Sequence, residues 1–139
     1  MFDEISSYAS PVLVDLLNKS RSANVTCVVA TQSLADLEYT AGDAFKQQII
    51  ENCNNYIVLR QNSAKSSEEW AKIIGTKNTM AVTYQIQDNN SKGTGYGSAR
   101  RVREFIYHPD EIKQLKTGVA YFISKDTGEH SKINVRKPF

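Results

Sequence analysis

The chain has 139 residues, of which 40% are hydrophobic and 23% charged, so it can form one globular domain with a core and is too short for two ordinary domains. Its net charge of +2 is unevenly placed, because residues 1–91 hold 7 basic and 10 acidic side chains whereas residues 92–139 hold 10 basic and 5 acidic ones. No apolar run approaches the roughly 20 residues that span a bilayer and no signal-peptide pattern opens the chain, which excludes these two targeting classes and predicts a soluble, cytosolic piece.

An amphipathic helix and a buried strand are predicted in the first 30 residues. A serine–proline pair and helically spaced leucines and valines predict a helix over about 11–21. The continuous apolar run 25–30 is typical of a strand that is buried on both faces of a parallel sheet. Cys27 lies inside this run and Cys53 follows the next helix, so both are expected to be structural thiols in a reducing compartment.

Two further helix and strand units follow. A loop is expected up to Gly42, after which the apolar spacing predicts a helix over about 43–51. The apolar run 56–59 predicts a second buried strand, and a third helix is expected over about 66–74, where Gly75 would form its C-cap. The alternation of helices with buried strands predicts a mostly parallel sheet flanked by helices.

Strand patterns dominate the rest of the chain. The Asn-, Ser- and Gly-rich tract 87–97 predicts an exposed loop or a long hairpin connection. A short helix is predicted from Pro109, with acidic residues in its first turn, and is expected to end before Gly118. The strands are expected at 80–86, 101–107, 119–123 and 131–135.

The acidic pair Asp3 and Glu4 is placed where a predicted strand would end, and Gln32 follows the next strand. In P-loop nucleotide hydrolases an aspartate at such a position holds Mg²⁺ through water, a neighbouring glutamate polarises the attacking water, and a polar residue on the next strand senses the γ-phosphate. A solvated acidic pair and a plain loop glutamine are the alternatives. The sequence has no G-x-x-x-x-G-K-[ST] phosphate loop, and only Met1 and Phe2 precede the acidic pair, so we expect the phosphate-binding half to lie upstream in a longer protein.

Two arginines lie at the ends of predicted elements. Arg21 ends the first helix, where it would either act as an arginine finger across a subunit boundary or simply face the negative end of the helix dipole. Arg60 follows the strand 56–59 and could face a nucleotide or a neighbouring subunit, with a structural salt bridge as the alternative.

A basic cluster follows the polar tract. Arg100, Arg101 and Arg103 lie at the start of a predicted strand, and such a cluster could bind a DNA backbone or an acidic partner. A solvated strand face is the alternative. His108 and His130 join no metal-ligand spacing, so no metal site is expected from them.

Several segments together resemble one known family. The runs FDEISSYA at 2–9, RSANV at 21–25 and ATQSLADL at 30–37 resemble the C-terminal part of type IV secretion coupling proteins, the TraD/TraG family of conjugative DNA-translocating ATPases. Further similar runs are ENCN at 51–54, WAKIIGT at 70–76, VREF at 102–105 and HPDEI at 108–112. The resemblance spans most of the chain, and its most specific part is ATQSLADL combined with the upstream RSAN.

The resemblance implies a partial RecA-like P-loop ATPase fold, an α/β fold with a mostly parallel sheet and extra C-terminal strands. The chain would be a single domain over 1–139, the C-terminal half of a motor domain, with an α/β core at 1–76 and a strand-rich portion at 77–139. The full-length protein would be a membrane-anchored homo-hexameric ATPase at the cytoplasmic face of the bacterial inner membrane. It would deliver relaxase-bound DNA to a type IV secretion channel.

The same resemblance assigns roles to single residues. Asp3 and Glu4 would be the Walker B residues, with Asp3 holding Mg²⁺ through water, Arg21 the arginine finger and Gln32 the sensor. ATP and Mg²⁺ are the cofactors expected for the full-length protein, and none is expected for this chain, which lacks the phosphate loop and should not hydrolyse ATP alone. The expected partners are DNA and a relaxase or a relaxosome accessory protein. The alternative function is a non-catalytic module that docks this accessory protein, as the TraM-recognising region of the family does.

Overall fold

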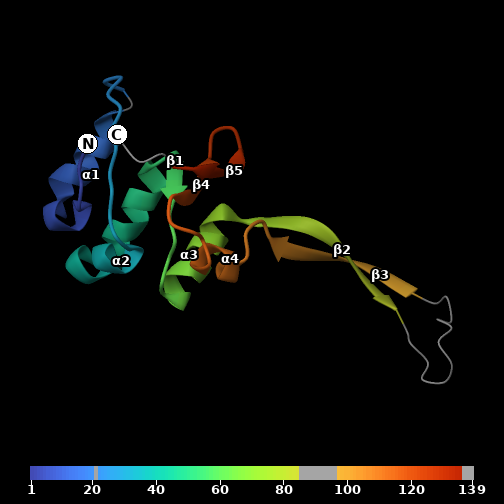
Figure 1. The fold of residues 1–139 in the computed structure, drawn as a ribbon. Coiled ribbons are helices and arrows are strands. Elements are labelled where there is room, and N and C mark those ends of the chain that lie inside the picture. The colour runs from blue at the N-terminus through green and yellow to red at the C-terminus, as the bar shows by residue number, and fades with distance from the viewer. Residues whose placement is uncertain (21, 85–96, 136–139) are drawn as a thin grey trace.

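The computed structural model describes residues 1–20, 22–84 and 97–135, which form a mixed α/β protein (Figure 1). The elements are, in chain order, η1 (Ile5–Tyr8), α1 (Pro11–Ser20), α2 (Leu34–Asn52), β1 (Asn55–Val58), α3 (Ala64–Ile74), β2 (Thr76–Tyr84), β3 (Gly97–Phe105), α4 (Pro109–Lys113), β4 (Val119–Ser124) and β5 (His130–Asn134). The helices and a three-stranded sheet form a body, and a two-stranded ribbon of β2 and β3 extends away from it (Figure 1). None of the helices described is long and apolar enough to cross a membrane. The tract predicted as a loop at 87–97 lies almost wholly outside the described residues.

The predicted helices form, and one of them is longer than expected. α1 and α3 lie within two residues of their predicted bounds, and Gly75 ends α3 with a φ of 104°, as a C-cap glycine can. α2 begins at Leu34, because the Ser33 hydroxyl accepts a hydrogen bond from the backbone N–H of Asp36 at 3.2 Å and so caps the helix. Gly42 interrupts α2 with a φ of 82°. The predicted break therefore has the right position, but the residues before it are helical and not a loop.

The strands pair in an antiparallel manner, which corrects the expectation of a mostly parallel sheet. One sheet has the order β1–β4–β5, a second consists of β2 and β3, and all pairings in both are antiparallel. β4 and β5 are joined by a tight turn in which Gly128 has a φ of 68°, and strands joined in this way must run in opposite directions. The mixed α/β class is confirmed, whereas these strands do not form the parallel sheet.

Residues 25–30 are extended but are not the doubly buried strand that their apolar run predicts. One parallel bridge joins Val29 to Phe2, and the Phe2 N–H donates a hydrogen bond to the Val28 carbonyl at 2.8 Å. Val25 and Val28 remain 52% and 51% exposed. The prediction of burial on both faces is wrong for this chain, because in the described part only Phe2 pairs with this segment.

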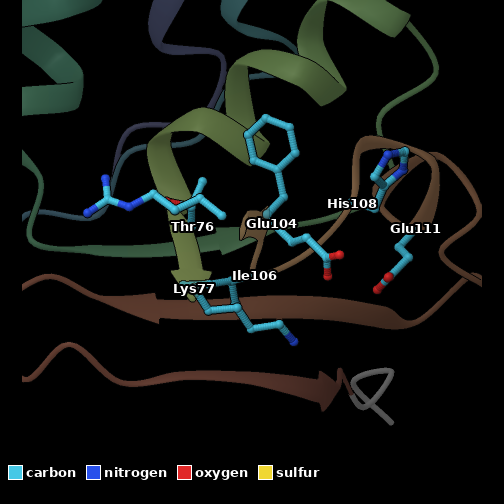
Figure 2. A pocket seen from close by; sticks show the side chains of 8 residues that line it. Thr76, Lys77, Glu104, Ile106, His108 and Glu111 are labelled. Atoms are coloured by element: carbon cyan, nitrogen blue, oxygen red, sulfur yellow. The ribbon is translucent and has the colours of Figure 1, made fainter. Parts of the chain in front are cut away.

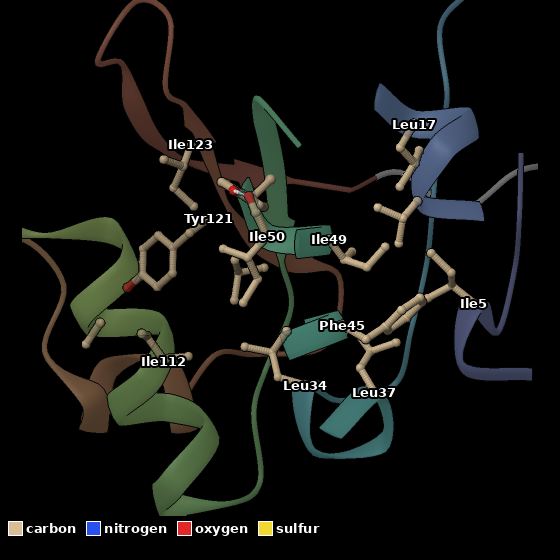
Figure 3. Packing of buried hydrophobic residues seen from close by; sticks show 14 of the residues in the cluster. Ile5, Leu17, Leu34, Leu37, Phe45, Ile49, Ile50, Ile112, Tyr121 and Ile123 are labelled. Carbon is tan, nitrogen blue, oxygen red and sulfur yellow. Dashed lines mark hydrogen bonds between the residues drawn. The ribbon is translucent and has the colours of Figure 1, made fainter. Parts of the chain in front are cut away.

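The hydrophobic core lies between the helices and one face of the three-stranded sheet (Figure 3). Large side chains from five different elements are at most 2% exposed in it, namely Ile5, Leu37, Val58, Ile112 and Tyr121. Trp70 packs against this core edge-on to Tyr56, with the ring centroids 5.5 Å apart. The core thus connects the N-terminal segment to β4, so the chain folds as one unit around it.

Lys46 is a buried cation that joins α2 to α3. It is 3% exposed, and its Nζ lies 2.9 Å from Glu38 Oε2, 2.9 Å from Asp43 Oδ1 and 2.7 Å from Glu69 Oε1. Burial alone would lower the pKa of Lys46, but the three carboxylates hold that pKa above its ordinary value. The hydrogen bond from Lys46 in turn lowers the pKa of both Glu38 and Asp43. The network is therefore ionised at neutral pH and stabilises the contact between the two helices.

We predict that Lys46→Met lowers the free energy of unfolding by about 2 kcal/mol at pH 7, because three carboxylates lose their shared cation. Glu38 and Asp43 have lowered pKa values in the folded state, so their contribution is present above the unfolded carboxyl pKa and is lost as pH falls through the folded values. The raised pKa of Lys46 has the opposite sign, and its contribution is lost only as the solution becomes strongly alkaline.

Urea unfolding at neutral pH and at about pH 3 measures both the loss and its pH dependence. Lys65→Met is the matched control, because among the described residues Lys65 pairs with Glu38 alone and its side chain is 69% exposed. Its removal should cost less than about 0.5 kcal/mol. Equal losses for the two variants, or a loss for Lys46→Met that does not shrink in acid, would contradict the buried network.

Candidate functional site

The acidic pair lies directly after the bridge between Phe2 and the segment 25–30. The Ile5 N–H donates a hydrogen bond to the Ala30 carbonyl at 2.9 Å, and the Ile5 side chain is 1% exposed, so the chain is fixed on the far side of the pair. Glu4 has a left-handed backbone, with φ 50° and ψ 54°, and its N–H donates to Asp3 Oδ1 at 3.0 Å. Such a conformation costs a non-glycine residue roughly 1 kcal/mol and is frequent at functional sites.

Glu4 and Gln32 meet across 28 residues of sequence. Gln32 Nε2 donates a hydrogen bond to Glu4 Oε1 at 2.8 Å, and both side chains are at the surface. The sequence places each of them at the end of an extended segment, and the structure shows that the two ends are neighbours. A hydrogen bond to a carboxylate is stronger than one between neutral groups, so Gln32 fixes the orientation of the Glu4 side chain.

A polar hollow of about 280 Å³ opens beside Gln32. It is lined by residues that follow the segment 25–30 and residues that follow β1, namely Gln32, Ser33, Asp36, Arg60, Gln61, Asn62, Ser63 and Ser66. α2 and α3 both begin here, with Ser33 and Ser63 as their N-cap residues. Helix N-termini carry partial positive charge and free N–H groups, and Arg60 adds a full charge, so the hollow favours an anion despite the Asp36 carboxylate.

Some of the predicted site residues lie together at the polar hollow, and others do not. Gln32 and Arg60 line the same hollow, and Glu4 reaches it through its hydrogen bond to Gln32. Asp3 is the neighbour of Glu4 and is exposed. Arg21 lies outside the described residues. The capping serines were missed at this site, although a serine directly before a helical apolar pattern is the signal that identifies an N-cap.

The basic cluster of β3 is exposed but is not one patch. Ala81 lies opposite Arg100, Met80 opposite Arg101 and Asn78 opposite Arg103 in the register of the ribbon. Because side chains alternate between the two faces of a strand, Arg101 and Arg103 share one face and Arg100 lies on the other. The three arginines predicted as one binding cluster are thus split.

A second hollow, of about 520 Å³, lies at the base of the ribbon beside α4 (Figure 2). It is lined by Thr76, Lys77, Arg103, Glu104, Phe105, Ile106, His108 and Glu111. Figure 2 shows the side chains of Glu104 and Glu111 extending toward the same part of this hollow. Since its walls carry two basic and two acidic side chains, the second hollow favours no single sign of charge.

The donor set at the acidic pair fits magnesium better than a structural metal. In the described ranges 1–20, 22–84 and 97–135, no group of three or more His, Cys, Asp or Glu side chains is arranged to hold a metal ion. Mg²⁺ keeps several waters and is usually bound through one or two carboxylates together with substrate phosphates. Asp3 and Glu4 offer carboxylate oxygens at the surface, and Glu4 is hydrogen-bonded to Gln32 in the lining of the polar hollow.

The family of the chain follows from a comparison over most of its length. A family model described as the TraM recognition site of TraD and TraG matches residues 1–117. The chain belongs to this family. The matched range includes the acidic pair, Gln32, both hollows and the whole ribbon, so these features lie in the TraD/TraG region itself.

Solved structures of the conjugative coupling protein TrwB share the fold of this TraD/TraG chain. The unbound form of TrwB gives a TM-score of 0.82 at 24% identity, over 99% of this chain and 31% of the TrwB chain. TrwB in complex with ADP and Mg²⁺ gives a TM-score of 0.77 at 23% identity, over 99% and 30%. Together with the family match, this confirms the expected resemblance to the C-terminal part of a TraD/TraG coupling protein.

A protein of Mycoplasma pneumoniae described as uncharacterized is 34% identical over 79 residues, which are 57% of this chain and 53% of that protein. The TraD/TraG chain therefore spans about half the length of this curated relative and about a third of the TrwB chains.

Proposed function

We propose that this TraD/TraG chain forms one half of an ATP-hydrolysing site in a longer coupling protein, which moves relaxase-bound DNA to a type IV secretion channel. The supporting observation is the hydrogen bond between Gln32 and Glu4 beside an anion-favouring hollow that also holds Arg60. These side chains follow three extended segments, and ligand sites of α/β proteins lie at the carboxyl ends of strands. The cytoplasmic face of the bacterial inner membrane is the proposed location.

The proposed roles follow from the positions of the side chains. Asp3 holds Mg²⁺ through water, and Glu4 polarises the attacking water while Gln32 keeps its carboxylate in place and contacts the γ-phosphate. Arg60 and the N-termini of α2 and α3 bind phosphate oxygens. Bound ATP and Mg²⁺ supply the phosphoryl group and the neutralisation of its charge. Arg21 keeps its predicted role as an arginine finger that reaches a neighbouring subunit of a homo-hexamer.

The proposal includes a RecA-like parallel sheet that the longer protein completes. β1 pairs with β4 along one edge, and the segment 25–30 pairs with Phe2, so each has a further edge that no described strand covers. Val28 and Ile57 on these segments are 51% and 63% exposed. A parallel strand that carries the missing phosphate loop would extend the sheet and bring the loop's N–H groups to the polar hollow, and the helix that connects it would cover these side chains.

A second candidate function is the docking of a relaxosome accessory protein. The family description names TraM recognition, and the hollow at the base of the ribbon offers an exposed surface with charges of both signs. Docking needs no nucleotide. Substitutions in this second hollow would then impair capture of the partner while ATP hydrolysis persists.

We predict that Arg60→Ala weakens ATP binding by the longer coupling protein about tenfold and lowers DNA-stimulated hydrolysis at least as much, because a guanidinium–phosphate contact is worth about 1.4 kcal/mol or more. Titration with a fluorescent ATP analogue, and phosphate release with and without single-stranded DNA, measure the two effects. Lys72→Ala is the control, because Lys72 is exposed in the last turn of α3 and does not line the hollow.

The outcomes separate the two candidate functions. Unchanged ATP binding in Arg60→Ala would remove Arg60 from the site. A wild-type longer protein that neither binds nor hydrolyses ATP would refute the motor and leave docking as the better account.

A further inference from the structure

Thr31 is a partly buried residue beside Gln32, and neither candidate function gives it a role. Its hydroxyl donates a hydrogen bond to the Ser33 carbonyl at 3.1 Å, so this bond spans Gln32, where the chain bends. A threonine hydroxyl that bonds a nearby backbone group stabilises a local conformation that the backbone does not fix by itself. The hydroxyl of Thr31 therefore constrains the part of the backbone that carries the Gln32 side chain.

The acceptor of this bond belongs to a fixed helix end. Ser33 is the N-cap of α2, and its hydroxyl accepts a hydrogen bond from the Asp36 N–H at 3.2 Å. The next residue, Leu34, is 3% exposed and belongs to the hydrophobic core. A hydrogen bond to the Ser33 carbonyl thus ties the loop to the start of α2.

The residue before Thr31 is fixed as well. The Ala30 N–H donates a hydrogen bond to the Phe2 carbonyl, and the Ala30 carbonyl accepts one from the Ile5 N–H, both at 2.9 Å. Phe2 and Ile5 lie on the two sides of the acidic pair. Ala30 therefore holds the backbone around Glu4 and the start of the bend at Gln32 in one arrangement.

Two residues remain between the fixed positions Ala30 and Ser33. In the part of the chain that the structure describes, the backbone N–H and carbonyl groups of Thr31 and Gln32 form no hydrogen bond to another backbone group. The Gln32 amide nevertheless reaches Glu4 Oε1 at 2.8 Å, which requires a defined backbone direction at Gln32. The Thr31 hydroxyl supplies a constraint of this kind.

Given the proposed ATP site, on which this inference rests, we propose that Thr31 is a positioning residue for ATP hydrolysis. It holds Gln32 where the amide orients the Glu4 carboxylate and contacts the γ-phosphate. Thr31 does not line the polar hollow, so it acts through Gln32 and not on the nucleotide. Without the hydroxyl, Gln32 spends part of its time in other orientations, and Glu4 then lacks the donor that orients its carboxylate. The loss falls on turnover rather than on ATP binding.

Thr31→Val tests this role, because it removes the hydroxyl and keeps a β-branched side chain of similar size. In the longer coupling protein it should lower kcat for DNA-stimulated ATP hydrolysis about three- to tenfold, the range expected for one lost hydrogen bond, and leave KM within about twofold. Thr31→Ser keeps the hydroxyl and should restore kcat to within about twofold of wild type. In the Gln32→Ala background, Thr31→Val should have no further effect, because the side chain that it positions is gone.

Thr26→Val is the matched control. Thr26 is an exposed threonine of the extended segment 25–30 and does not line the polar hollow, so this change should leave kcat and KM unchanged.

Nuclear magnetic resonance of the 139-residue chain tests the positioning without nucleotide. The side-chain amide signals of Gln32 are identified by their loss in Gln32→Ala. In Thr31→Val these signals should shift toward their positions in Glu4→Ala, where the hydrogen bond cannot form. In Thr31→Ser and Thr26→Val they should stay near their wild-type positions.

Three outcomes would overturn the proposal: Gln32 signals that do not move in Thr31→Val, a loss of kcat in Thr31→Ser as large as in Thr31→Val, or a further loss when Thr31→Val is added to Gln32→Ala. The last two would reduce Thr31 to a residue that only supports the fold. A longer protein that does not hydrolyse ATP would refute the proposed function itself, and the amide signals would then decide whether Thr31 holds Gln32 in place.

Discussion

Glu4→Gln in the longer coupling protein should lower ATP hydrolysis by about 10²- to 10³-fold and leave ATP binding within about twofold of wild type. The glutamine keeps the Oε1 atom that accepts the hydrogen bond from Gln32, so the geometry next to the hollow is preserved. What it loses is the negative charge that polarises the attacking water. A large effect on turnover with a small effect on binding is the expected pattern when an interaction acts mainly in the transition state.

Two further variants make this prediction specific. Asp15→Asn removes an exposed carboxylate from α1, at a distance in sequence from the acidic pair, and should leave hydrolysis unchanged. Gln32→Ala should lower hydrolysis about tenfold, because the Glu4 carboxylate loses the donor that orients it, and the double variant should be no slower than Glu4→Gln alone. Normal hydrolysis by Glu4→Gln would mean that the acidic pair is only a solvated surface feature.

The candidate site residues could be selected from the sequence because they are polar or charged residues at the ends of predicted strands. Gln32 and Arg60 each follow an apolar run, which locates them from the sequence, whereas Glu4 follows only Met1 and Phe2 and is identified by the acidic pair itself. The contact between Glu4 and Gln32 cannot be predicted from local sequence patterns, because it depends on how distant segments pack. The split of the basic cluster is also tertiary in origin, because it follows from the pairing register of β2 with β3.

The errors in the predicted fold have identifiable causes. The first half of α2 was expected to be a loop because Gly42 suggested a helix start, but Ser33 and the buried Leu34 and Leu37 begin the helix earlier. The parallel sheet is expected from the alternation of helices with apolar runs, of which 25–30 is one. An apolar run of this kind is typical of a strand that is buried on both faces. In the described chain only Phe2 pairs with this segment, and its valines stay about half exposed.

An acidic substitution at one of the uncovered apolar positions should therefore have different effects in two settings. Ile57→Asp in the 139-residue chain should change the free energy of unfolding by less than about 1 kcal/mol, because Ile57 is 63% exposed there. In the longer coupling protein the same change should cost at least about 3 kcal/mol, since it would bury an unpaired carboxylate beneath a helix that covers the outer face of the completed sheet. Denaturant unfolding of both proteins measures the difference between the two costs.

Tyr39→Asp provides the matched control, because Tyr39 is an apolar side chain on α2 that is 94% exposed and lies outside the sheet. Its cost should be small in both proteins. A small cost of Ile57→Asp in the longer protein would mean that no added layer covers the outer face of β1. The RecA-like completion of the sheet, with helices on both faces, would then be wrong even if ATP is hydrolysed. A large cost confined to the longer protein would explain why an exposed strand keeps isoleucine at position 57, since its sequence would be adapted to a neighbour that this chain does not contain.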